Sequence, residues 1–248
     1  MSVSNWGKRL KSKVQYRRVL IKLSGEALMG NEGYGIDQIV VSDMAKQIKE
    51  IKELGVEVAI VLGGGNIYRG KKGEKKGMDR VTGDYMGMMA TVINALALQH
   101  TLEKLGVEAV VQTALKIEKI AEPYVRKDAL GHLKEGRVII FACGTGNPYF
   151  TTDTAAALRA IEIKAEILLK ATKVDGVFDK DPELHKNAQF YPEISYSDVL
   201  NKDLQVMDLT AITLCKENQL PLAVFNMRKK GNLKKAVLGE HIGTIVRR

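Results

Sequence analysis

The stretch RVIIFACGTGNPYFTTDTAAALRAIEI (residues 137–163) contains an apolar run, a loop rich in glycine and threonine, and an alanine-rich segment. The run at 137–142 has the near-continuous hydrophobicity of a strand that is buried on both faces. Thr151, Thr152 and Asp153 stand where a helix begins, and their side-chain oxygens are suited to capping its free N–H groups. The stretch therefore predicts a strand, a loop and a helix in succession, and it raises the question of what the loop holds.

The same order of strand and helix recurs along the whole chain. Strands are predicted at residues 18–23, 56–62, 107–113, 137–142, 166–171, 222–225 and 243–246. Helices are predicted up to Gly55, at 84–105, within 117–134, from about 153, near 208–218 and from Asn232. Apolar strands that alternate with helices pack as a mainly parallel sheet covered on both faces. We therefore expect an α/β fold, a three-layer αβα sandwich around a central twisted sheet.

The composition is that of one large domain, or two closely joined lobes, without a membrane segment. The chain has 248 residues, 45% of them hydrophobic, and no apolar run approaches the roughly 18 residues that cross a bilayer. The N-terminus lacks the apolar core of a secretory signal. Cys143 and Cys215 are predicted to be reduced core residues, and the four histidines show no ligand spacing. We expect a cytoplasmic protein with no membrane partner and no metal site built from its own side chains.

The formal net charge of +9 is concentrated at the N-terminus. Residues 1–18 hold six Lys and Arg and no acid, which leaves an excess of +3 for the rest of the chain. A basic, flexible tail over residues 1–16 explains the charge better than a nucleic-acid-binding surface, for which no recognition motif is present. Nucleic acid is therefore not an expected partner, whereas basic loops suit an anionic small molecule.

Three glycine-containing turns follow predicted strands, and ligands of such sheets bind where the strands end. The turns are KLSG (22–25), GGGN (63–66) and GTGN (144–147). Three successive glycines in GGGN remove every β-carbon, so backbone N–H groups can approach an anion closely. We favour a phosphate-binding turn there over a purely structural turn, which needs only one or two glycines.

Two familiar nucleotide motifs are excluded. The run GNIYRGKK (65–72) has Lys72 where a P-loop needs the hydroxyl that binds magnesium. The loop GTGNPY has Tyr149 where a dinucleotide fingerprint needs a third small residue. Arg69 is still suited to grip two phosphate oxygens, with a solvated surface arginine as the alternative. Thr145 and Asn147 supply donors and acceptors that suit a planar polar ligand.

Lys22 interrupts an apolar strand, and a buried lysine is costly unless its charge meets a partner. Asp153 is predicted at the same edge of the sheet and is the candidate partner. The alternatives are a lysine whose ammonium reaches solvent at the strand end and an aspartate that only caps its helix. We favour a functional role for Lys22, whereas Asp153 taken alone favours the cap.

The segment LKATKVDGVFDKDP (169–182) places charged residues around a turn. Lys170 and Lys173 are candidates to assist Lys22, and Phe178 is suited to covering an adenine ring. Asp175 and Gly176 form a candidate hairpin turn. Taken alone, the segment is more typical of a solvated charged turn.

Five segments together resemble the bacterial uridylate (UMP) kinases, which have the amino-acid-kinase fold. They are KLSGEAL (22–28), GGGNIYRG (63–70), GDYMGMMATVINALAL (83–98), GTGNPYFTTDTAAALRAIEI (144–163) and LKATKVDGVFDKDP (169–182). The resemblance covers residues 17–247 in the family's order and spacing. It implies a single domain over residues 17–248, with an acceptor-binding lobe at about 17–165 and an ATP-binding lobe at about 166–248.

The resemblance implies transfer of the ATP γ-phosphoryl group to UMP, giving UDP, with Mg²⁺ held mainly by the nucleotide phosphates. The residues implied to bind ATP are Lys22, Leu23, Ser24, Gly25, Gly65, Arg69, Thr172, Phe178 and Asp181. Those implied to bind UMP are Gly64, Asp84, Thr145, Gly146, Asn147, Pro148, Tyr149, Phe150, Thr151 and Thr152.

The resemblance also implies regulation and assembly. An effector site, with GTP as activator and UTP as inhibitor, matches Gly30, Asn31, Glu32, Gly33, Tyr34 and Gly35. Family members form homohexamers built as trimers of dimers. The helix at 84–105 is a candidate dimer contact, with a fully buried core helix as the alternative.

We expect Lys22, Asp153 and Arg69 to carry the chemistry. Lys22 would follow the transferred phosphoryl group, Arg69 would bridge phosphates and Asp153 would orient Lys22. Two rival functions remain open. An amino-acid or carbamate kinase shares the lysine strand and the glycine turns, and a non-catalytic nucleotide sensor or nucleic-acid-binding regulator would use the basic tail.

Overall fold

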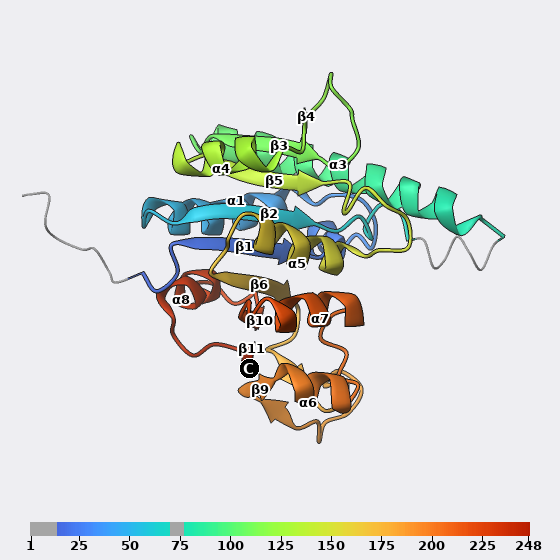
Figure 1. Ribbon diagram of the computed structural model, residues 1–248, viewed down its shortest axis with the longest axis vertical. Coiled ribbons are helices and arrows are strands. Elements are labelled where there is room, and N and C mark those ends of the chain that lie inside the picture. The colour runs from blue at the N-terminus through green and yellow to red at the C-terminus, as the bar shows by residue number, and fades with distance from the viewer. Residues whose placement is uncertain (1–13, 70–76) are drawn as a thin grey trace, which may run out of the picture.

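The computed structural model describes residues 14–69 and 77–248. The predicted basic tail (1–16) and the charged segment 70–80 therefore lie largely outside the described residues. Within these ranges, nine strands form one sheet in the order β4-β3-β5-β2-β1-β6-β10-β11-β9 (Figure 1). Their bounds are β1 Arg18–Leu23, β2 Glu57–Leu62, β3 Ala109–Thr113, β4 Glu122–Pro123, β5 Val138–Ala142, β6 Ile167–Thr172, β9 Glu193–Ser195, β10 Leu222–Asn226 and β11 Thr244–Arg247.

Within the described chain, every strand pair of this sheet is parallel except β10 with β11. Helices cover both faces. Their bounds are α1 Gln38–Glu53, α3 Arg80–Lys104, α4 Arg126–Lys134, α5 Thr152–Glu162, α6 Tyr196–Asn201, α7 Leu209–Glu217 and α8 Asn232–Leu238, with a 3₁₀ turn η1 at Gly25–Met29. The predicted α/β sandwich is confirmed, with one addition: α3 is long enough that its amino-terminal half projects beyond the sheet (Figure 1).

The core is divided by the sheet into two hydrophobic layers. One layer packs α1, α3 and α8 against the sheet, and the other packs α4, α5, α6 and α7 against the opposite face. On α1, the helix predicted to end near Gly55, Val41, Met44, Ile48 and Ile51 lie on one face and are buried in the first layer. Cys143 and Cys215 are both buried and free, as predicted for reduced core residues.

Strand alternation decides which layer each side chain of β1 enters. Val19, Ile21 and Leu23 belong to the layer of α1, whereas Leu20 belongs to the layer of α5. Lys22 has the same parity as Leu20 and therefore faces α5. No helix among the described residues is long and apolar enough to cross a membrane.

Two predictions about local structure need correction, and some short elements were not predicted. The hairpin predicted at Asp175 and Gly176 is absent: β7 (Val177–Phe178) pairs instead with the distant β8 (Phe190–Tyr191). Gly176 is needed for close packing, since a Cβ there would lie 2.5 Å from Thr244 Oγ1. Helix α3 begins four residues before the predicted position because Asp79 caps it by accepting from the Thr82 N–H. Strands β4 and β9 and helix α6 were not predicted, since all three are too short to show a period.

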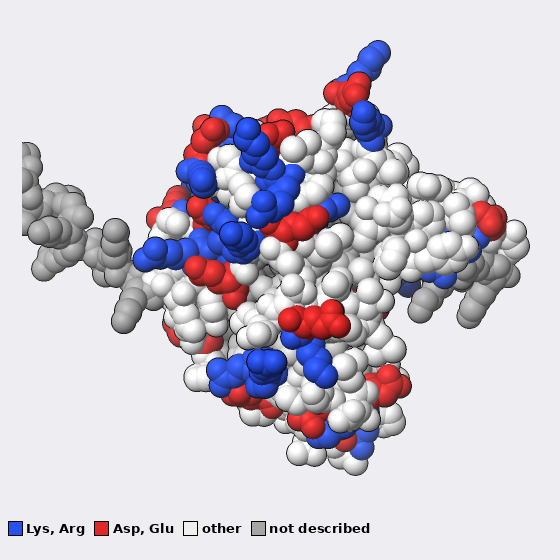
Figure 2. All heavy atoms as spheres, viewed as in Figure 1, with Lys and Arg blue, Asp and Glu red and all other residues white. Residues whose placement is uncertain are grey.

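Charged side chains are distributed unevenly on the surface. Figure 2 shows Lys and Arg mixed with Asp and Glu at the side where the central strands begin, over α4 and the start of β1. The area toward α3 and the carboxyl ends of the strands is largely uncharged on the same face. The charge-rich region is thus on the opposite side from the strand ends, where ligands of parallel sheets bind.

Candidate active site

Two lysines and one aspartate form a buried ionic cluster at the carboxyl end of the central strands. Lys22 in β1 and Lys170 in β6 are direct neighbours in register, on the face that carries α5. Lys22 Nζ lies 2.7 Å from Asp153 Oδ1, and Lys170 Nζ lies 2.8 Å from Asp153 Oδ2. The contact predicted between Lys22 and Asp153 is therefore present, and Lys170 is the second partner.

The cap of helix α5 leaves Asp153 available for this cluster. Thr151 is the capping residue, since its Oγ1 accepts from the N–H groups of Asp153 and Thr154. The interpretation of Asp153 as merely a helix cap is wrong, because its carboxylate points to the two lysines instead. Thr151, two residues before Asp153, provides the cap that Asp153 taken alone was expected to provide.

The electrostatics of the cluster favour an anionic ligand. Burial raises the pKa of the Asp153 carboxyl, but the Lys22 and Lys170 ammoniums outweigh burial and hold the pKa below its ordinary value. Burial lowers the pKa of Lys170; Asp153 opposes that shift and the charge of Lys22 adds to it. Two ammoniums and one carboxylate leave one positive charge among these three residues, which attracts an anion to this end of the sheet, although the nearby Asp208 carboxylate offsets part of it.

The GGGN turn packs tightly against its neighbours. The Gly63 N–H donates to Leu23 O at 2.9 Å, which joins this turn to the end of β1. A Cβ on Gly64 would lie 2.7 Å from Gly87 O and 2.8 Å from Ala90 Cβ, both in α3. Any side chain at Gly64 would therefore force α3 away from the turn. At Gly64 the glycine is required by packing, while Gly65 meets nothing closer than 3.6 Å and is open toward a ligand.

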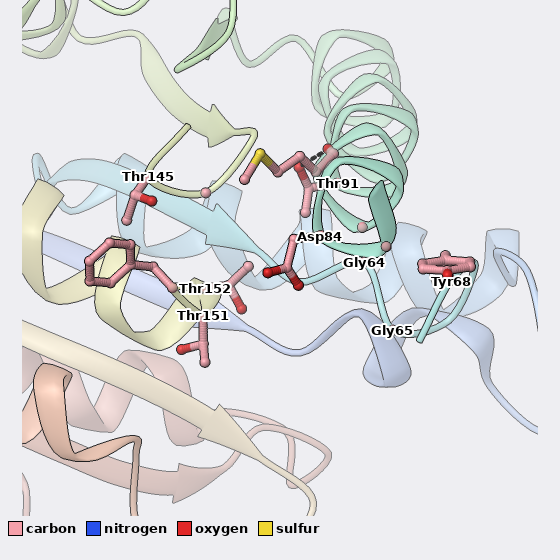
Figure 3. A pocket seen from close by; sticks show the side chains of 13 residues that line it. Gly64, Gly65, Tyr68, Asp84, Thr91, Thr145, Thr151 and Thr152 are labelled. Atoms are coloured by element: carbon pink, nitrogen blue, oxygen red, sulfur yellow. Dashed lines mark hydrogen bonds between the residues drawn. The ribbon is translucent and has the colours of Figure 1, made fainter. Parts of the chain in front are cut away.

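A cavity lies between the GGGN turn, the amino-terminal part of α3 and the GTGN loop (Figure 3). Asp84 points into it from α3, and Thr151 and Thr152 approach it from the start of α5 (Figure 3). Six of its lining residues were predicted to bind UMP: Gly64, Asp84, Thr145, Phe150, Thr151 and Thr152. Tyr68, Gly83, Gly87, Met88, Thr91 and Gly144 also line it and were not predicted.

Asp84 closes the cavity from the side of the GTGN loop. Its Oδ2 accepts from the Tyr149 backbone N–H at 2.7 Å and from Arg80 Nε at 2.9 Å. Tyr149 has a left-handed backbone with φ of 72°, which is uncommon for a residue with a side chain. The Asp84 carboxylate thus holds an otherwise unfavourable loop conformation in place. The remaining predicted loop residues, Gly146, Asn147 and Pro148, stay beside the cavity without lining it.

Arg69 lies at the other end of the GGGN turn. Its guanidinium forms a 2.7 Å ion pair with Glu26 and donates from Nε to Gly65 O. Glu26 follows the KLSG turn, whose residues Ser24 and Gly25 were predicted to bind ATP. Arg69 therefore connects the two glycine turns, and its half-exposed position leaves it within reach of a ligand at their junction.

The other residues predicted to bind ATP lie beyond the end of β6. Thr172 is the last residue of that strand, and its hydroxyl donates to Val174 O. Phe178 packs at a tilt against Phe190, with the ring centroids 5.3 Å apart, and Asp181 accepts from the Glu183 N–H. Lys173 is paired with Glu183 and both side chains are more than half exposed, so Lys173 does not join the buried cluster.

The segment Gly30–Gly35, predicted to be an effector site, is an exposed loop after η1. Tyr34 is 67% exposed. The Gly35 N–H donates to Asn66 O at 3.0 Å, so the loop is fastened to the GGGN turn.

Asp208 is a residue of the site that sequence reasoning missed. It caps α7 by accepting from the Ala211 N–H, and it also accepts from the hydroxyls of Thr151 and Thr154 in α5. Two residues earlier, Val206 O accepts from Lys170 Nζ at 2.5 Å. From the sequence, an aspartate before a helix is predicted only to cap that helix. Its contacts with Thr151 and Thr154 could not be predicted, because they join segments that are distant in the sequence.

Comparison with known proteins identifies the family to which this chain belongs. Residues 17–226 match the amino acid kinase family. The chain belongs to the amino acid kinase family. The expected family and fold are therefore confirmed.

Three solved structures that resemble this chain are those of UMP or uridylate kinases. A UMP kinase from Bacillus anthracis is 42% identical, with a TM-score of 0.91 over 94% of this chain and 96% of that one. A UMP kinase from Ureaplasma parvum is also 42% identical, with a TM-score of 0.88 over 94% and 99%. A uridylate kinase from Archaeoglobus fulgidus is 29% identical, with a TM-score of 0.72 over 92% and 99%.

Proposed function

We propose that this chain is a UMP kinase, which transfers the γ-phosphoryl group of ATP to UMP and gives UDP. One observation carries the proposal: a largely buried Lys22–Asp153–Lys170 cluster lies directly after Thr151 and Thr152, which line the cavity between the GGGN turn and the GTGN loop. The similarity to three UMP or uridylate kinases over more than nine-tenths of the chain supports the same reaction.

The reaction leaves positioning and charge compensation to the protein. Lys22 would follow the transferred group and offset its developing charge. Asp153 would hold Lys22 and Lys170 in place and need not take a proton, because the UMP phosphate is already ionised. Arg69 would exchange its contact with Glu26 for nucleotide phosphate oxygens, which a guanidinium can grip in pairs.

The acceptor would occupy the lobe at about 17–165, in the cavity of Figure 3. Asp84 would bind there, and Gly64 and Thr145–Thr152 would surround the nucleotide. A polar base edge read by hydrogen bonds rejects a mismatched analogue strongly, so CMP should react far more slowly than UMP. ATP would occupy the lobe at about 166–248, with Thr172, Phe178 and Asp181 on the side of its base and ribose, and Leu23–Gly25 and Gly65 near its phosphates.

Mg²⁺ would arrive with ATP. Among the described residues, no group of three His, Cys, Asp or Glu could hold a metal ion. Asp153 and Asp208 are already engaged by lysines and threonines. These residues fit an ion bound through nucleotide phosphates, where it would offset phosphate charge, and not a dedicated protein cage.

Assembly and regulation complete the proposal. A homohexamer would use the side of α3 on which Tyr85, Met86, Met89 and Ile93 are exposed. The Gly30–Gly35 loop would bind an effector, with GTP activating and UTP inhibiting. A cytoplasmic location suits an enzyme with two free, buried cysteines.

The test is ADP release from ATP and Mg²⁺ with UMP, CMP, glutamate or carbamate, with and without GTP and UTP. UMP-dependent ADP release is expected, and release with glutamate or carbamate alone would favour the rival kinases. A nucleic-acid regulator would instead show salt-dependent DNA binding that is lost when residues 1–18 are deleted.

A further inference from the structure

Two buried asparagines outside the predicted binding sets lie behind the GGGN turn. Asn66 ends the turn and Asn94 lies in the middle of α3, with exposed fractions of 2% and 0%. Asn66 Nδ2 donates to Asn94 Oδ1 at 2.9 Å, and Asn94 Nδ2 donates to Asn66 Oδ1 at 2.7 Å. The two side-chain amides therefore form a closed, reciprocal pair.

The second proton of each amide goes to a backbone carbonyl. Asn66 Nδ2 donates to Gly35 O, and Asn94 Nδ2 donates to Gly63 O, both at 2.7 Å. These contacts fix the orientation of both amides, because a turned amide would set its oxygen against a carbonyl oxygen. All four N–H donors of the pair have acceptors, so the buried polar groups are satisfied in this one arrangement.

The pair joins segments that are distant in the sequence. Asn66 and Gly35 are linked twice, since the Gly35 N–H also donates to Asn66 O. Gly25 of the KLSG turn packs against the pair: a Cβ there would lie 2.6 Å from Asn66 Oδ1 and 2.7 Å from the Gly65 nitrogen. Both glycine turns, α3 and the Gly30–Gly35 loop thus meet at one buried contact.

A buried polar pair of this kind is stable only when its hydrogen bonds are complete, so it specifies one arrangement of the segments that it joins. We propose that the Asn66–Asn94 pair is a positioning element that holds the GGGN turn in the shape needed for phosphoryl transfer and fastens it to the Gly30–Gly35 loop. Neither asparagine touches the nucleotide in this proposal, which rests on the proposed kinase function.

The kinetic test compares Asn66→Ala, Asn94→Ala and the volume-preserving Asn94→Leu with wild type. A misplaced turn should lower kcat by about tenfold or more, with KM for ATP and UMP changing by less than about threefold. The double alanine variant should lose no more than the worse single variant, because the pair acts as a unit. Gln99→Ala is the matched control: Gln99 lies in the same helix and donates to Ala109 O at 3.0 Å, away from the turn.

The control separates positioning from general stability. Gln99→Ala should keep kcat within about twofold of wild type at a similar loss of melting temperature. The proposal is overturned if both single alanine variants, folded by circular dichroism, also stay within about twofold. An equal fall of kcat in Gln99→Ala would overturn it as well.

A second measurement uses the wild-type chain and needs no activity. The amides of Gly35, Gly63 and Tyr68 donate to Asn66 O, Leu23 O and Gly64 O. If the joined segments open as one cooperative unit, the hydrogen–deuterium exchange rates of these three amides should give the same opening free energy. Exchange of Gly35 at the rate of an unprotected loop amide would refute the fastening. If exchange is common but UMP yields no ADP, the proposed function fails while the structural role of the pair stands.

Discussion

At the scale of single residues, the site depends on which face of β1 carries Lys22. Alternation sends Lys22 toward α5, and the parallel register with β6 sets Lys170 beside it. Two like charges side by side are unfavourable unless an acid bridges them. Asp153 does so from the first turn of α5, with one carboxylate oxygen for each ammonium.

Lys22→Ala and Asp153→Asn are each expected to lower kcat for UMP by about 10²–10³, because each removes or misaligns one charge-stabilising donor. The coupled ADP-release assay measures this, and thermal unfolding verifies the fold. Lys173→Ala is the matched control, since Lys173 pairs with Glu183 at the surface, and it should retain activity within about twofold. Near-normal turnover in both site variants would remove the catalytic assignment.

The lowered pKa of Lys170 predicts an alkaline limb in the pH profile of kcat/KM. As pH rises through that pKa, Lys170 loses its proton and the cluster loses its excess positive charge. Activity should therefore decline at a pH below the range in which an ordinary lysine loses its proton. Lys170→Arg should move the limb to higher pH, because arginine stays charged. A limb unchanged in Lys170→Arg would assign it to another group.

Gly64→Ala tests the packing of the GGGN turn on α3. Its Cβ would meet Gly87 O at 2.7 Å, so we expect a loss of unfolding free energy of about 1–3 kcal/mol together with weaker UMP binding. Gly131→Ala is the control, since a Cβ in that helix meets nothing within 4 Å and should stabilise by about 1 kcal/mol. Chemical denaturation measures the free energy of unfolding, and UMP titration measures the affinity for UMP. If Gly64→Ala matches wild type in both, α3 can shift away from the turn at little cost.

At the scale of secondary-structure elements, the start of α5 is held by three neighbours. Thr151 caps it, Asp84 of α3 holds the preceding loop, and Asp208 ties it to α7. The N–H groups at the start of a helix suit anions. Because the loop before α5 leads directly into this start, the contacts that fix α5 also fix the loop around the acceptor.

Asp208→Ala should therefore do more than remove a cap. Loss of an ordinary cap costs about 1 kcal/mol, and here the hydroxyls of Thr151 and Thr154 also lose their acceptor, so about 2–3 kcal/mol is expected. KM for UMP should rise because the loop before α5 loosens. Ser195→Ala removes the cap of α6 away from the site and is the control. Equal effects of the two variants on stability and KM would contradict a bridging role.

At the scale of the whole molecule, α3 presents an apolar stripe to solvent. Tyr85, Met86, Met89 and Ile93 are 42%, 40%, 40% and 50% exposed and lie on one side of the helix. Exposed apolar patches of this kind mark interaction surfaces. The interpretation of this helix as fully buried is wrong, since only its other side enters the core.

Ile93→Glu is expected to lower the assembly state, because a charge would have to be buried in the contact. Sedimentation velocity at micromolar concentration measures the mass of wild type and variant. Leu184→Glu, at a residue that is 77% exposed elsewhere, should leave the mass unchanged. A monomeric wild-type chain, or an unchanged mass in Ile93→Glu, would show that the stripe is not the contact.

The sequence by itself determined the order of the longer elements, the mainly parallel sheet and the three glycine turns at its carboxyl edge. These features follow from local periodicity and from parallel topology, which brings the ends of alternating strands to one edge. The same local signals located Lys22 and Asp153, because a lysine in an apolar strand and an acid at a helix start both stand out against their surroundings.

Only the tertiary structure decided which candidate completes each contact. Lys170 and Lys173 are three residues apart, and strand register sends one to Asp153 while the other pairs with Glu183 at the surface. Asp208, Asn66 and Asn94 have partners 28 to 57 residues away, so their roles appear only once the segments are packed. Hydrogen bonds and ion pairs depend on fixed distances between atoms, which no local pattern encodes; burial patterns, in contrast, repeat along the chain.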